Sequence, residues 1–468
     1  MSTNIILGPP GTGKTTRLLD IMEEEFKNGC QPDRMMFCSF TKKAVEEAIS
    51  RATQRFNFTD KDMIYFKTIH SLAFHSLGLK KDMVMDKKDY KKIGEHLGLT
   101  FTGKGDVCDI VGGKSSGDRY TFIDSYSRAK TISIKSVWDS IDHDNLNWFE
   151  LLRYCDTLAE YKKSQNKFDF ADMLEHAQYE FKIDVVIIDE AQDLSIAQWN
   201  FINRVTKNAK KIYIGGDDDQ AIFNWSGADV NYFMNVKGQV ETLTQSYRVP
   251  KEIHKLASSI TNKIHHRTDK IYHAKDVAGS VQYWKDVDHV DFNTGTWLLL
   301  ARNSYLLDEL AGSVRAKGHT YAIKGTSTIG KNHVRAIKQY ERWRKEAKLT
   351  TEDVNLVTEF TGTEFWDKSK IWHEAFVKMP LADREYYISL LRRGESLTNN
   401  PRININTIHG VKGGEADNVV LLTDMAYTSW NYSNVDSDSE HRVWYVGATR
   451  AKDNLHIIMP RGRYHYNI

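Results

Sequence analysis

A run of residues near the start of the chain has the composition and spacing of a phosphate-binding loop. It follows the pattern G-x-x-x-x-G-K-[ST] and consists of Gly8, Pro9, Pro10, Gly11, Thr12, Gly13, Lys14 and Thr15. Glycines let the backbone turn tightly enough for its N–H groups to face phosphate oxygens. Lys14 would reach the β- and γ-phosphates, and the Thr15 hydroxyl would bind Mg²⁺. The run, together with Thr16, therefore predicts a site for ATP and Mg²⁺.

An acidic pair supplies the second half of such a site. Asp189 and Glu190 follow the apolar run Val185–Ile188. Asp189 would hold Mg²⁺, and Glu190 would orient and deprotonate the attacking water. A solvated acidic turn is the alternative, but the P-loop favours the catalytic interpretation. Arg248 and Arg450 are candidates for stabilising the charge that develops on the γ-phosphate.

The elements that must position these residues alternate between short apolar runs and helical patterns. The expected strands are 4–7, 35–38, 185–188, 211–214, 281–284, 297–301, 403–405, 419–422 and 455–459. A helix is expected to begin at Lys14, and another over 41–55 carries Val45, Ala48, Ile49 and Ala52 on one face. Strand–loop–helix repetition predicts an α/β fold with parallel sheets and helices on both faces.

Two polar, mainly helical stretches interrupt this pattern, at about 76–165 and 326–395. We therefore expect two α/β cores, each holding one helical insertion. The first core would comprise 1–75 and 166–250, and the second 251–325 and 396–468, with no further domain appended.

Composition excludes several other classes of protein. The 468 residues include 64 Lys and Arg against 62 Asp and Glu, so any nucleic-acid surface must be locally basic. The four cysteines, Cys30, Cys38, Cys108 and Cys155, form no CxxC pair and are expected to be reduced thiols in a cytoplasmic protein, without a zinc site. Apolar runs are too short to cross a bilayer, and the N-terminus does not resemble a signal peptide.

Further motifs follow the P-loop in a specific order. They are Ser39–Ala44, Thr68–Ser71, Asp169–Leu174, Asp189–Asp193, Gly216–Trp225 with Gly227-Ala228, Gln245–Arg248, Leu300–Asn303, Thr407–Glu415 and Tyr445–Ala451. In this order and spacing they resemble superfamily-one DNA helicases of the UvrD/Rep/PcrA type. The resemblance extends from residue 8 to residue 451 and depends on the combination, because no motif after the P-loop is specific alone.

The resemblance implies two RecA-like cores that hydrolyse ATP between them and drive 3′-to-5′ movement on single-stranded DNA, with unwinding at duplex junctions. It assigns γ-phosphate sensing to Gln220 and stacking near adenine to Tyr247. Arg248 and Arg450 would contact the γ-phosphate from opposite sides of the cleft. Glu415 would lie near the ribose.

The same resemblance implies a set of strand contacts. They are Phe40, Thr68, His70, Phe223, Trp225 and His409. Aromatic faces stack on any base, at roughly 1–3 kcal/mol each, without reading sequence. Trp225 follows Gln220 by five residues, so a nucleotide-driven shift could reach a stacked base. Core packing is the alternative for the aromatic residues, and a buried structural role is the alternative for His70 and His409.

The chain also departs from the family pattern. Seven residues precede Gly8, where relatives carry a segment with an adenine-reading Gln, so the selectivity for ATP over other nucleotides is open. Ser226 stands where Arg is common, and Gly414 and Ala416 replace larger apolar residues. Arg302 and Thr407 are 105 positions apart, which leaves a short second insertion. This compactness would suit a phage or mobile-element enzyme in a bacterial cytoplasm or infected host.

Three other functions fit parts of this pattern. A translocase could strip proteins or remodel recombination intermediates with little unwinding, which the short second insertion would allow. A nucleotide-gated scaffold would need a degenerate site, which the intact motif residues disfavour. RNA is the weaker alternative to DNA, because stacking and phosphate contacts do not exclude it. The sequence does not separate replication, repair, recombination and defence.

Overall fold

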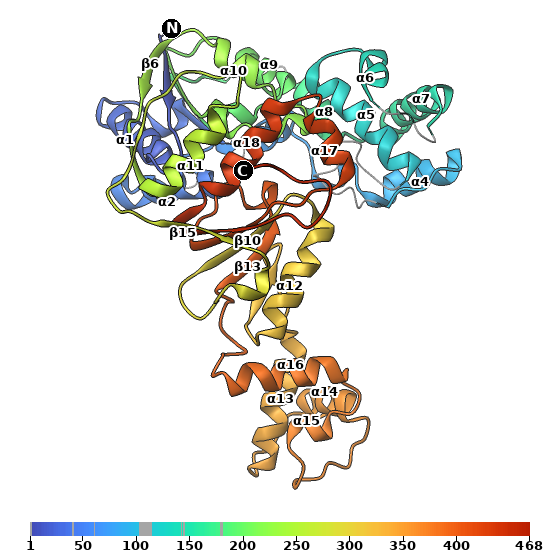
Figure 1. Cartoon of the computed structure of the whole chain (residues 1–468). Coiled ribbons are helices and arrows are strands. Elements are labelled where there is room, and N and C mark those ends of the chain that lie inside the picture. Colours follow the sequence, from blue (N-terminus) through green and yellow to red (C-terminus); the bar gives the residue numbers. More distant parts are fainter. Residues whose placement is uncertain are drawn as a thin grey trace. The chain divides into compact units, whose positions relative to one another are not determined.

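The computed structural model describes residues 2–39, 42–59, 61–102, 115–141, 143, 146–177 and 181–468. The chain forms two compact units (Figure 1). Unit 1 comprises Met1–Ala278 and Tyr427–Thr449, and unit 2 comprises Gly279–Ala426 and Arg450–Ile468. Unit 1 therefore includes residues 251–278 and 427–449, which the expected division assigns to the second core.

The sheet of unit 1 has six strands in the order β3-β2-β4-β5-β1-β6, and all of its pairings are parallel. The strands are β1 Ser2–Leu7, β2 Met35–Ser39, β3 Phe66–Thr68, β4 Val185–Asp189, β5 Lys211–Gly216 and β6 Gln239–Thr242. The expected strands of this core are confirmed, as is the parallel α/β fold. Two more strands, β7 Gln245–Pro250 and β8 His273–Lys275, pair separately.

The register of this sheet gathers the predicted chemistry at one edge. Leu7 at the end of β1 pairs with Gly216 at the end of β5, and Asp189 ends β4 opposite Ser39 of β2. Because the strands are parallel, the loops that follow β1, β4 and β5 leave the sheet on the same side.

Helices cover the sheet because their apolar faces need a partner. They are α1 Lys14–Lys27, α2 Lys42–Phe56, α3 Ile69–Ser76, α8 Phe170–His176, α9 Ile196–Val205 and α10 Val230–Asn235. Two hydrophobic clusters form the core on either side of the strands. Leu18 and Met22 of α1 pack in one of them and Phe201 of α9 in the other, all fully buried.

The first insertion is helical, as expected. It contains α4 Lys87–Leu97, α5 Ser116–Lys130, α6 Ile134–Ser140 and α7 Trp148–Gln165. A separate cluster around Tyr120, Ile123, Leu151 and Tyr154 forms its core. Residues 103–114, which include Cys108, lie outside the described residues.

The motif Asp169–Leu174 fixes this insertion to the first core. The Asp169 and Asp172 side chains form a capping box at the start of α8. Arg128 of α5 donates to Asp169 Oδ2 at 2.9 Å and to Asp172 Oδ1 at 2.6 Å. Lys162 of α7 donates to Asp169 Oδ2 at 2.6 Å. The two aspartates therefore have a structural role in joining three helices.

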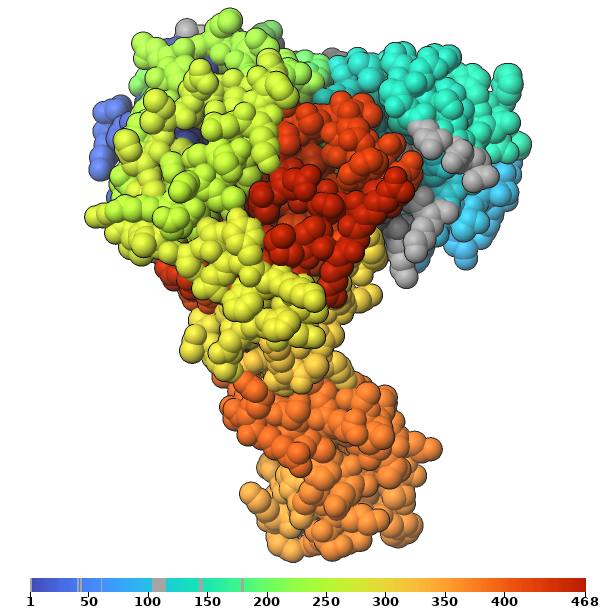
Figure 2. All heavy atoms as spheres, viewed as in Figure 1, coloured from blue at the N-terminus to red at the C-terminus, as the bar shows by residue number. Residues whose placement is uncertain are grey.

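The end of unit 1 comes from a distant part of the chain. Helix α11 (Lys251–Thr261) packs on α18 (Ser437–Ala448), and α17 (Tyr427–Ser433) precedes α18. Figure 2 shows residues near the C-terminus beside residues that follow position 250. The buried face of α11 carries Ile253, Ala257 and Ile260. These contacts explain why the compact unit extends beyond residue 250.

Unit 2 has a seven-stranded sheet in the order β12-β11-β13-β10-β14-β15-β9, in which only the β11–β12 pair is antiparallel. Its strands are β9 Ser280–Trp284, β10 Trp297–Ala301, β11 Tyr321–Ile323, β12 Thr326–Ser327, β13 Ile403–Thr407, β14 Ala416–Leu422 and β15 Ala451–Ile458. The expected strands of the second core are confirmed.

Five helices complete unit 2. They are α12 Leu307–Ala316, α13 Lys331–Arg344, α14 Thr351–Thr361, α15 Trp372–Ala375 and α16 Leu381–Arg392. The last four form the second helical segment and gather together in Figure 1. Tyr340, Trp372 and Tyr387 of this segment share one hydrophobic cluster with Leu299 and Val420 of the sheet. Within the described residues, none of the helices has the length and apolar character that crossing a membrane requires.

Candidate nucleotide site and its neighbours

The phosphate-binding loop joins the end of β1 to the start of α1. Gly11 and Gly13 have left-handed backbone with φ of 72° and 81°, a conformation that residues with a side chain rarely adopt. The N–H of Gly8 donates to the carbonyl of Gly216 on β5 at 3.0 Å. The loop therefore lies at the edge of the sheet and at the N-terminus of a 14-residue helix. Backbone N–H groups in this arrangement bind phosphate.

The acidic pair faces the last two residues of the loop. The Thr15 hydroxyl donates to Asp189 Oδ2 at 2.8 Å, and the Lys14 ammonium donates to Glu190 Oε1 at 2.9 Å. Lys14 Nζ is also 3.8 Å from Asp189 Oδ1. Glu190 has a φ of 55°, which is uncommon for a non-glycine residue and occurs often at functional sites. The structure brings these four predicted residues into one cluster.

Burial and mutual pairing set the charges in this cluster. Burial raises the pKa of Asp189, while the Lys14 ammonium opposes that rise. Burial alone would lower the pKa of Lys14, but the nearby carboxylates of Glu190 and Asp189 outweigh it and hold this pKa above its usual value. Lys14 therefore keeps its positive charge at neutral pH, as a phosphate ligand must.

Thr15 and Asp189 offer the ligand chemistry that Mg²⁺ requires. Both present hard oxygen atoms, which lie 2.8 Å apart in the hydrogen bond between them. Mg²⁺ in nucleotide sites takes one or two protein oxygens and completes its shell with phosphates and water. Among the described residues there is no group of three or more His, Cys, Asp or Glu side chains that could hold a metal. The donor set thus suits Mg²⁺ brought with a nucleotide.

A chain of hydrogen bonds connects the acidic pair to the end of β5. The Gln192 amide donates to Glu190 Oε2 at 2.6 Å, and its oxygen accepts from the Asp217 N–H at 3.1 Å. Asp217 Oδ2 in turn accepts from Gln220 Nε2 at 2.7 Å. All four residues belong to the two short 3₁₀ turns, with their capping residues, that follow β4 and β5 at the same edge of the sheet. Gln220, the predicted γ-phosphate sensor, is therefore joined to Glu190 through two intermediates.

The segment after β6 lies against the other side of the P-loop. The Ser246 hydroxyl donates to the Pro10 carbonyl at 2.7 Å, and the Tyr247 N–H donates to the Gly11 carbonyl at 2.8 Å. A Cβ atom at Gly11 would lie 2.3 Å from Cβ of Arg248, so only glycine fits there. Tyr247 is 73% exposed. Both predicted nucleotide contacts of this segment are adjacent to the loop, and their roles stay predictions.

Two family models match the chain. The UvrD/REP helicase N-terminal domain matches residues 1–241, and the UvrD-like helicase C-terminal domain matches residues 326–462. The chain belongs to the UvrD/Rep helicase family. The family expected from the order of the motifs is confirmed.

Individual relatives are distant. An ATP-dependent DNA helicase Rep of Buchnera aphidicola subsp. Baizongia pistaciae is 24% identical over 299 residues, which cover 59% of this chain and 44% of that protein. An ATP-dependent DNA helicase PcrA of Leuconostoc citreum is 25% identical over 285 residues, 57% of this chain and 38% of that protein. A probable DNA helicase of Mycoplasma pneumoniae is 21% identical over 97% of this chain and 80% of that protein. The chain spans less than half the length of the first two relatives.

Two aromatic residues follow Gln220 in this UvrD/Rep-type chain. The rings of Phe223 and Trp225 lie 6.2 Å apart in an edge-to-face arrangement, and both side chains are partly exposed. The indole nitrogen of Trp225 is buried and has no hydrogen-bond partner among the described residues. The pair is therefore not part of the hydrophobic core, and its proposed contact with a strand stays a prediction.

The other predicted strand contacts of unit 1 lie at the start of α3. Thr68 precedes this helix and His70 is in its first turn, and both are partly exposed. Phe170 lies beside His70, with ring centroids 5.3 Å apart, and is 63% exposed. Phe40 is outside the described residues.

The protonation of His70 gives a prediction about stability. Burial lowers the pKa of His70 to about 4, against about 6.5 in an unfolded chain. The unfolded state therefore binds the proton more tightly, and the stabilising contribution is complete above pH 6.5 and is lost as the pH falls towards 4. In urea titrations, the free energy of unfolding of the wild type should fall between pH 7.5 and pH 5. In His70→Gln, we expect this fall to be about 2 kcal/mol smaller. An unchanged loss in His70→Gln would contradict the assignment.

Unit 2 carries the remaining predicted site residues. His409 is 5% exposed and Arg450 is 1% exposed. Arg450 Nη1 is 3.4 Å from the carbonyl of Gly414. Glu415 pairs with Lys452 at 2.8 Å. The roles of His409, Arg450 and Glu415 toward strand and nucleotide stay predictions.

Sequence reasoning missed three residues that contact predicted site residues or their neighbours: Gln192 donates to Glu190, Phe170 lies beside His70, and Lys270 pairs with Asp217. Gln192 and Phe170 are inside quoted motifs, and their positions two residues after Glu190 and one after Asp169 were the available signals. Lys270 is outside every quoted motif, and no local pattern distinguishes it from other lysines.

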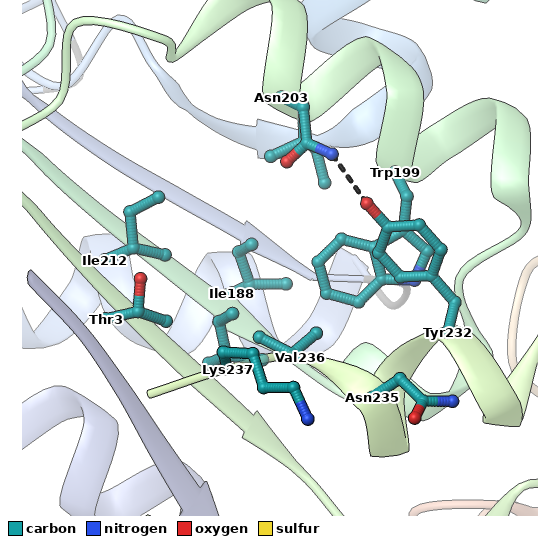
Figure 3. Close-up of a pocket in the computed structure, with 11 residues that line it drawn as sticks. Thr3, Ile188, Trp199, Asn203, Ile212, Tyr232, Asn235, Val236 and Lys237 are labelled. Atoms are coloured by element: carbon teal, nitrogen blue, oxygen red, sulfur yellow. Dashed lines mark hydrogen bonds between the residues drawn. The ribbon is translucent and has the colours of Figure 1, made fainter. Parts of the chain in front are cut away.

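A cavity of 320 Å³ lies on one face of the unit 1 sheet, under α9 and α10 (Figure 3). Its lining is mainly apolar and includes Ile188, Ile212, Trp199 and Tyr232. The Asn203 amide donates to the Tyr232 hydroxyl at 2.7 Å. No residue of the P-loop lines it, so this cavity is separate from the nucleotide site.

Proposed function

We propose that the chain is an ATP-dependent single-stranded DNA translocase and DNA helicase. One observation carries the proposal: the P-loop residue Lys14 and the acidic residue Glu190 form one cluster with a continuous hydrogen-bond path to Gln220. The partly exposed rings of Phe223 and Trp225 follow within five residues of Gln220. A translocase needs a path of this kind, which couples the state of the bound nucleotide to the surface that binds the strand.

The hydrolytic step uses groups with separate tasks. Lys14 neutralises the β- and γ-phosphates, and Thr15 and Asp189 would hold Mg²⁺, which supplies further charge neutralisation when bound. Lys14 is paired with Glu190. When the phosphates bind, they compete with Glu190 for the Lys14 ammonium. Glu190 is then available to orient the attacking water and accept its proton.

The strand surface uses stacking, which is independent of sequence. Trp225 and Phe223 offer rings on one segment, and Phe170 and His70 offer a second edge-to-face pair. Rings of this kind hold each base by roughly 1–3 kcal/mol. Residual exposure of all four side chains leaves them accessible to bases.

Trp225→Ala tests the strand surface directly. The loss of one stacked base should weaken single-stranded DNA binding by roughly 5- to 150-fold. Stimulation of hydrolysis by DNA should fall with it, while hydrolysis without DNA stays near the wild-type rate. Fluorescence anisotropy with labelled oligonucleotides and a phosphate-release assay measure the two effects. Trp225→Phe should retain most binding, and Ser226→Ala serves as the neighbouring control. Unchanged affinity in Trp225→Ala would remove this residue from the surface.

Polarity and unwinding are further parts of the proposal. Membership of the family supports 3′-to-5′ movement and the use of duplex junctions as substrates. A translocase that displaces bound proteins would move along a strand but open little duplex. Displacement of streptavidin from the 5′ or the 3′ end of an oligonucleotide measures polarity, and a tailed duplex measures unwinding.

The test of the whole proposal is ATP hydrolysis with and without single-stranded DNA. We expect DNA to stimulate hydrolysis by at least about tenfold, the factor that 1.4 kcal/mol of transition-state stabilisation supplies. Single-stranded RNA of the same sequence separates the two nucleic acids, and GTP separates ATP from other nucleotides. If neither DNA nor RNA stimulates ATP hydrolysis, the proposed motor function is wrong.

A further inference from the structure

Three consecutive aspartates after β5 are almost completely buried. Asp217, Asp218 and Asp219 are 0%, 0% and 2% exposed. Burying adjacent carboxylates is costly unless cations and hydrogen bonds compensate. Lys270 Nζ lies 3.2 Å from Asp217 and 3.1 Å from Asp219, and it also contacts Asp218. The Lys270 side chain is 1% exposed, so one buried ammonium forms ion pairs with all three carboxylates.

Two arginines also bind this turn, one at a carboxylate and one at the backbone. Arg267 donates through Nε and Nη2 to the two oxygens of Asp219, at 2.8 and 2.6 Å. Arg442 of α18 donates through Nε to the Asp218 carbonyl at 2.8 Å. Burial alone would raise the pKa of Asp219, but Arg267 and Lys270 outweigh it and hold this pKa below its usual value. Two cations, Lys270 and Arg267, thus face three carboxylates in unit 1, and Arg442 holds the backbone of the same turn.

One face of α18 holds the segment that carries Lys270. The residues on this face are spaced four and three apart, which places them together on a helix: Asp438, Arg442 and Tyr445. Asp438 Oδ1 accepts from the His265 N–H at 2.9 Å, and the Tyr445 hydroxyl is 3.2 Å from that of Tyr272. The segment 265–272 is therefore bound to α18 at both of the segment's ends, through His265 and Tyr272.

The same helix also holds the end of the aromatic segment. The Asn224 amide donates to the Ser439 hydroxyl at 2.7 Å. Asp217, one of the aspartates bound by Lys270, accepts the hydrogen bond from Gln220. Residues 217–225, which join the γ-phosphate sensor to Trp225, are therefore anchored at both ends.

We infer that Lys270 is a positioning residue that holds residues 217–225 rigid, so that contact between Gln220 and the γ-phosphate is transmitted to the strand-binding aromatic residues. Lys270 touches neither the P-loop nor the acidic pair in the contacts of its side chain with Asp217, Asp218 and Asp219. Its effect on hydrolysis would pass through Asp217 and Gln220. This inference rests on the proposed function.

Lys270→Met removes the charge and keeps the length of the side chain. We expect DNA-stimulated kcat to fall by about tenfold or more, because a displaced Gln220 no longer meets the transition state. Affinity for a fluorescent ATP analogue should change by less than about twofold, because the P-loop contacts remain. Hydrogen exchange of residues 217–226 should accelerate, while that of 2–27 stays constant. Lys255→Met, an exposed lysine on α11, is the matched control.

A lone Lys270→Met leaves three buried carboxylates short of one cation and could prevent folding. The double variant Lys270→Met with Asp218→Asn removes one charge of each sign and keeps the balance of the cluster. Arg267→Gln offers a milder change, because its side chain is 18% exposed. A folded variant that retains wild-type kcat and DNA stimulation would overturn the inference. A purely structural role would instead lower thermal stability and nucleotide affinity together, which would also overturn it.

The two proposals fail in different ways. Absent stimulation of the wild type by DNA contradicts the proposed motor, whatever the variants do. Normal stimulation of the wild type with unchanged stimulation in the folded Lys270 and Arg267 variants contradicts only the positioning role. Hydrogen exchange at 217–226 reports on the anchor without any hydrolysis.

Discussion

Glu190→Gln should lower the maximal rate of DNA-stimulated ATP hydrolysis by about 10²–10⁴-fold, the usual contribution of a general base. The substitution keeps the shape and the hydrogen-bonding capacity of the side chain but removes its basicity. Glu190 Oε2 accepts from the Gln192 amide and Oε1 accepts from Lys14, so a neutral amide also changes the path towards Gln220. Nucleotide affinity should stay the same or rise, because a carboxylate at position 190 no longer competes with the phosphates for the Lys14 ammonium.

The measurement is single-turnover and steady-state hydrolysis at saturating DNA, with equilibrium binding of nucleotide measured separately. Glu46→Gln, the same change at an exposed glutamate of α2, is the matched control. Binding of single-stranded DNA to Glu190→Gln should remain close to that of the wild type. Hydrolysis retained within about tenfold would assign the proton transfer to another group.

The sequence predicts most residues of this candidate nucleotide site because they directly follow apolar strand runs or belong to the P-loop pattern. Val185–Ile188 and Met35–Cys38 are apolar runs typical of strands buried on both faces, and parallel pairing puts their ends together. The P-loop pattern fixes Lys14 and Thr15 beside that edge. Family resemblance adds the order of the motifs, and the structure brings Asp189 and Glu190 to the loop at hydrogen-bonding distance.

Other elements lacked a local signal. Strand β3 has three residues, and β6 is exposed along most of its length, so neither forms a long apolar run. The assignment of α18 to unit 1 depends on contacts between residues that are more than 150 positions apart, such as Arg442 with the Asp218 carbonyl. No periodicity in either segment specifies such a pairing.

The aspartate cluster shows the same limit at the level of single residues. Asp217, Asp218 and Asp219 in the quoted motif resemble a solvated acidic turn by composition alone. Their burial depends on Lys270, which is more than 50 positions along the chain in a polar stretch. Charge patterning within one segment cannot show which lysine is buried, because burial is set by the packing of α11 and α18 around it.

Lys14→Ala should reduce kcat/KM for ATP by at least about 10³-fold, equivalent to roughly 4 kcal/mol of lost transition-state stabilisation. Lys14 is 8% exposed and its ammonium is fixed between Glu190 and Asp189, so no water-exposed lysine can replace it. Binding of single-stranded DNA without nucleotide should be largely retained, because Phe223 and Trp225 pack against each other and Asn224 is held by Ser439 of α18. Lys27→Ala, at the exposed end of the same helix, is the matched control.

The same substitution also tests the electrostatics of the cluster. Without Lys14, the buried carboxyl of Asp189 loses its neighbouring cation, and its pKa should rise further above the usual value. Removing one partner of a buried ion pair costs about 3–5 kcal/mol of stability, so thermal unfolding must accompany the kinetics. Lys14→Met, which keeps the aliphatic part of the side chain, separates lost packing from lost charge. If either variant folds, binds DNA and still hydrolyses ATP within about tenfold of the wild type, then the phosphates are neutralised by another cation and the site must be assigned again, beginning with Arg248 beside Gly11.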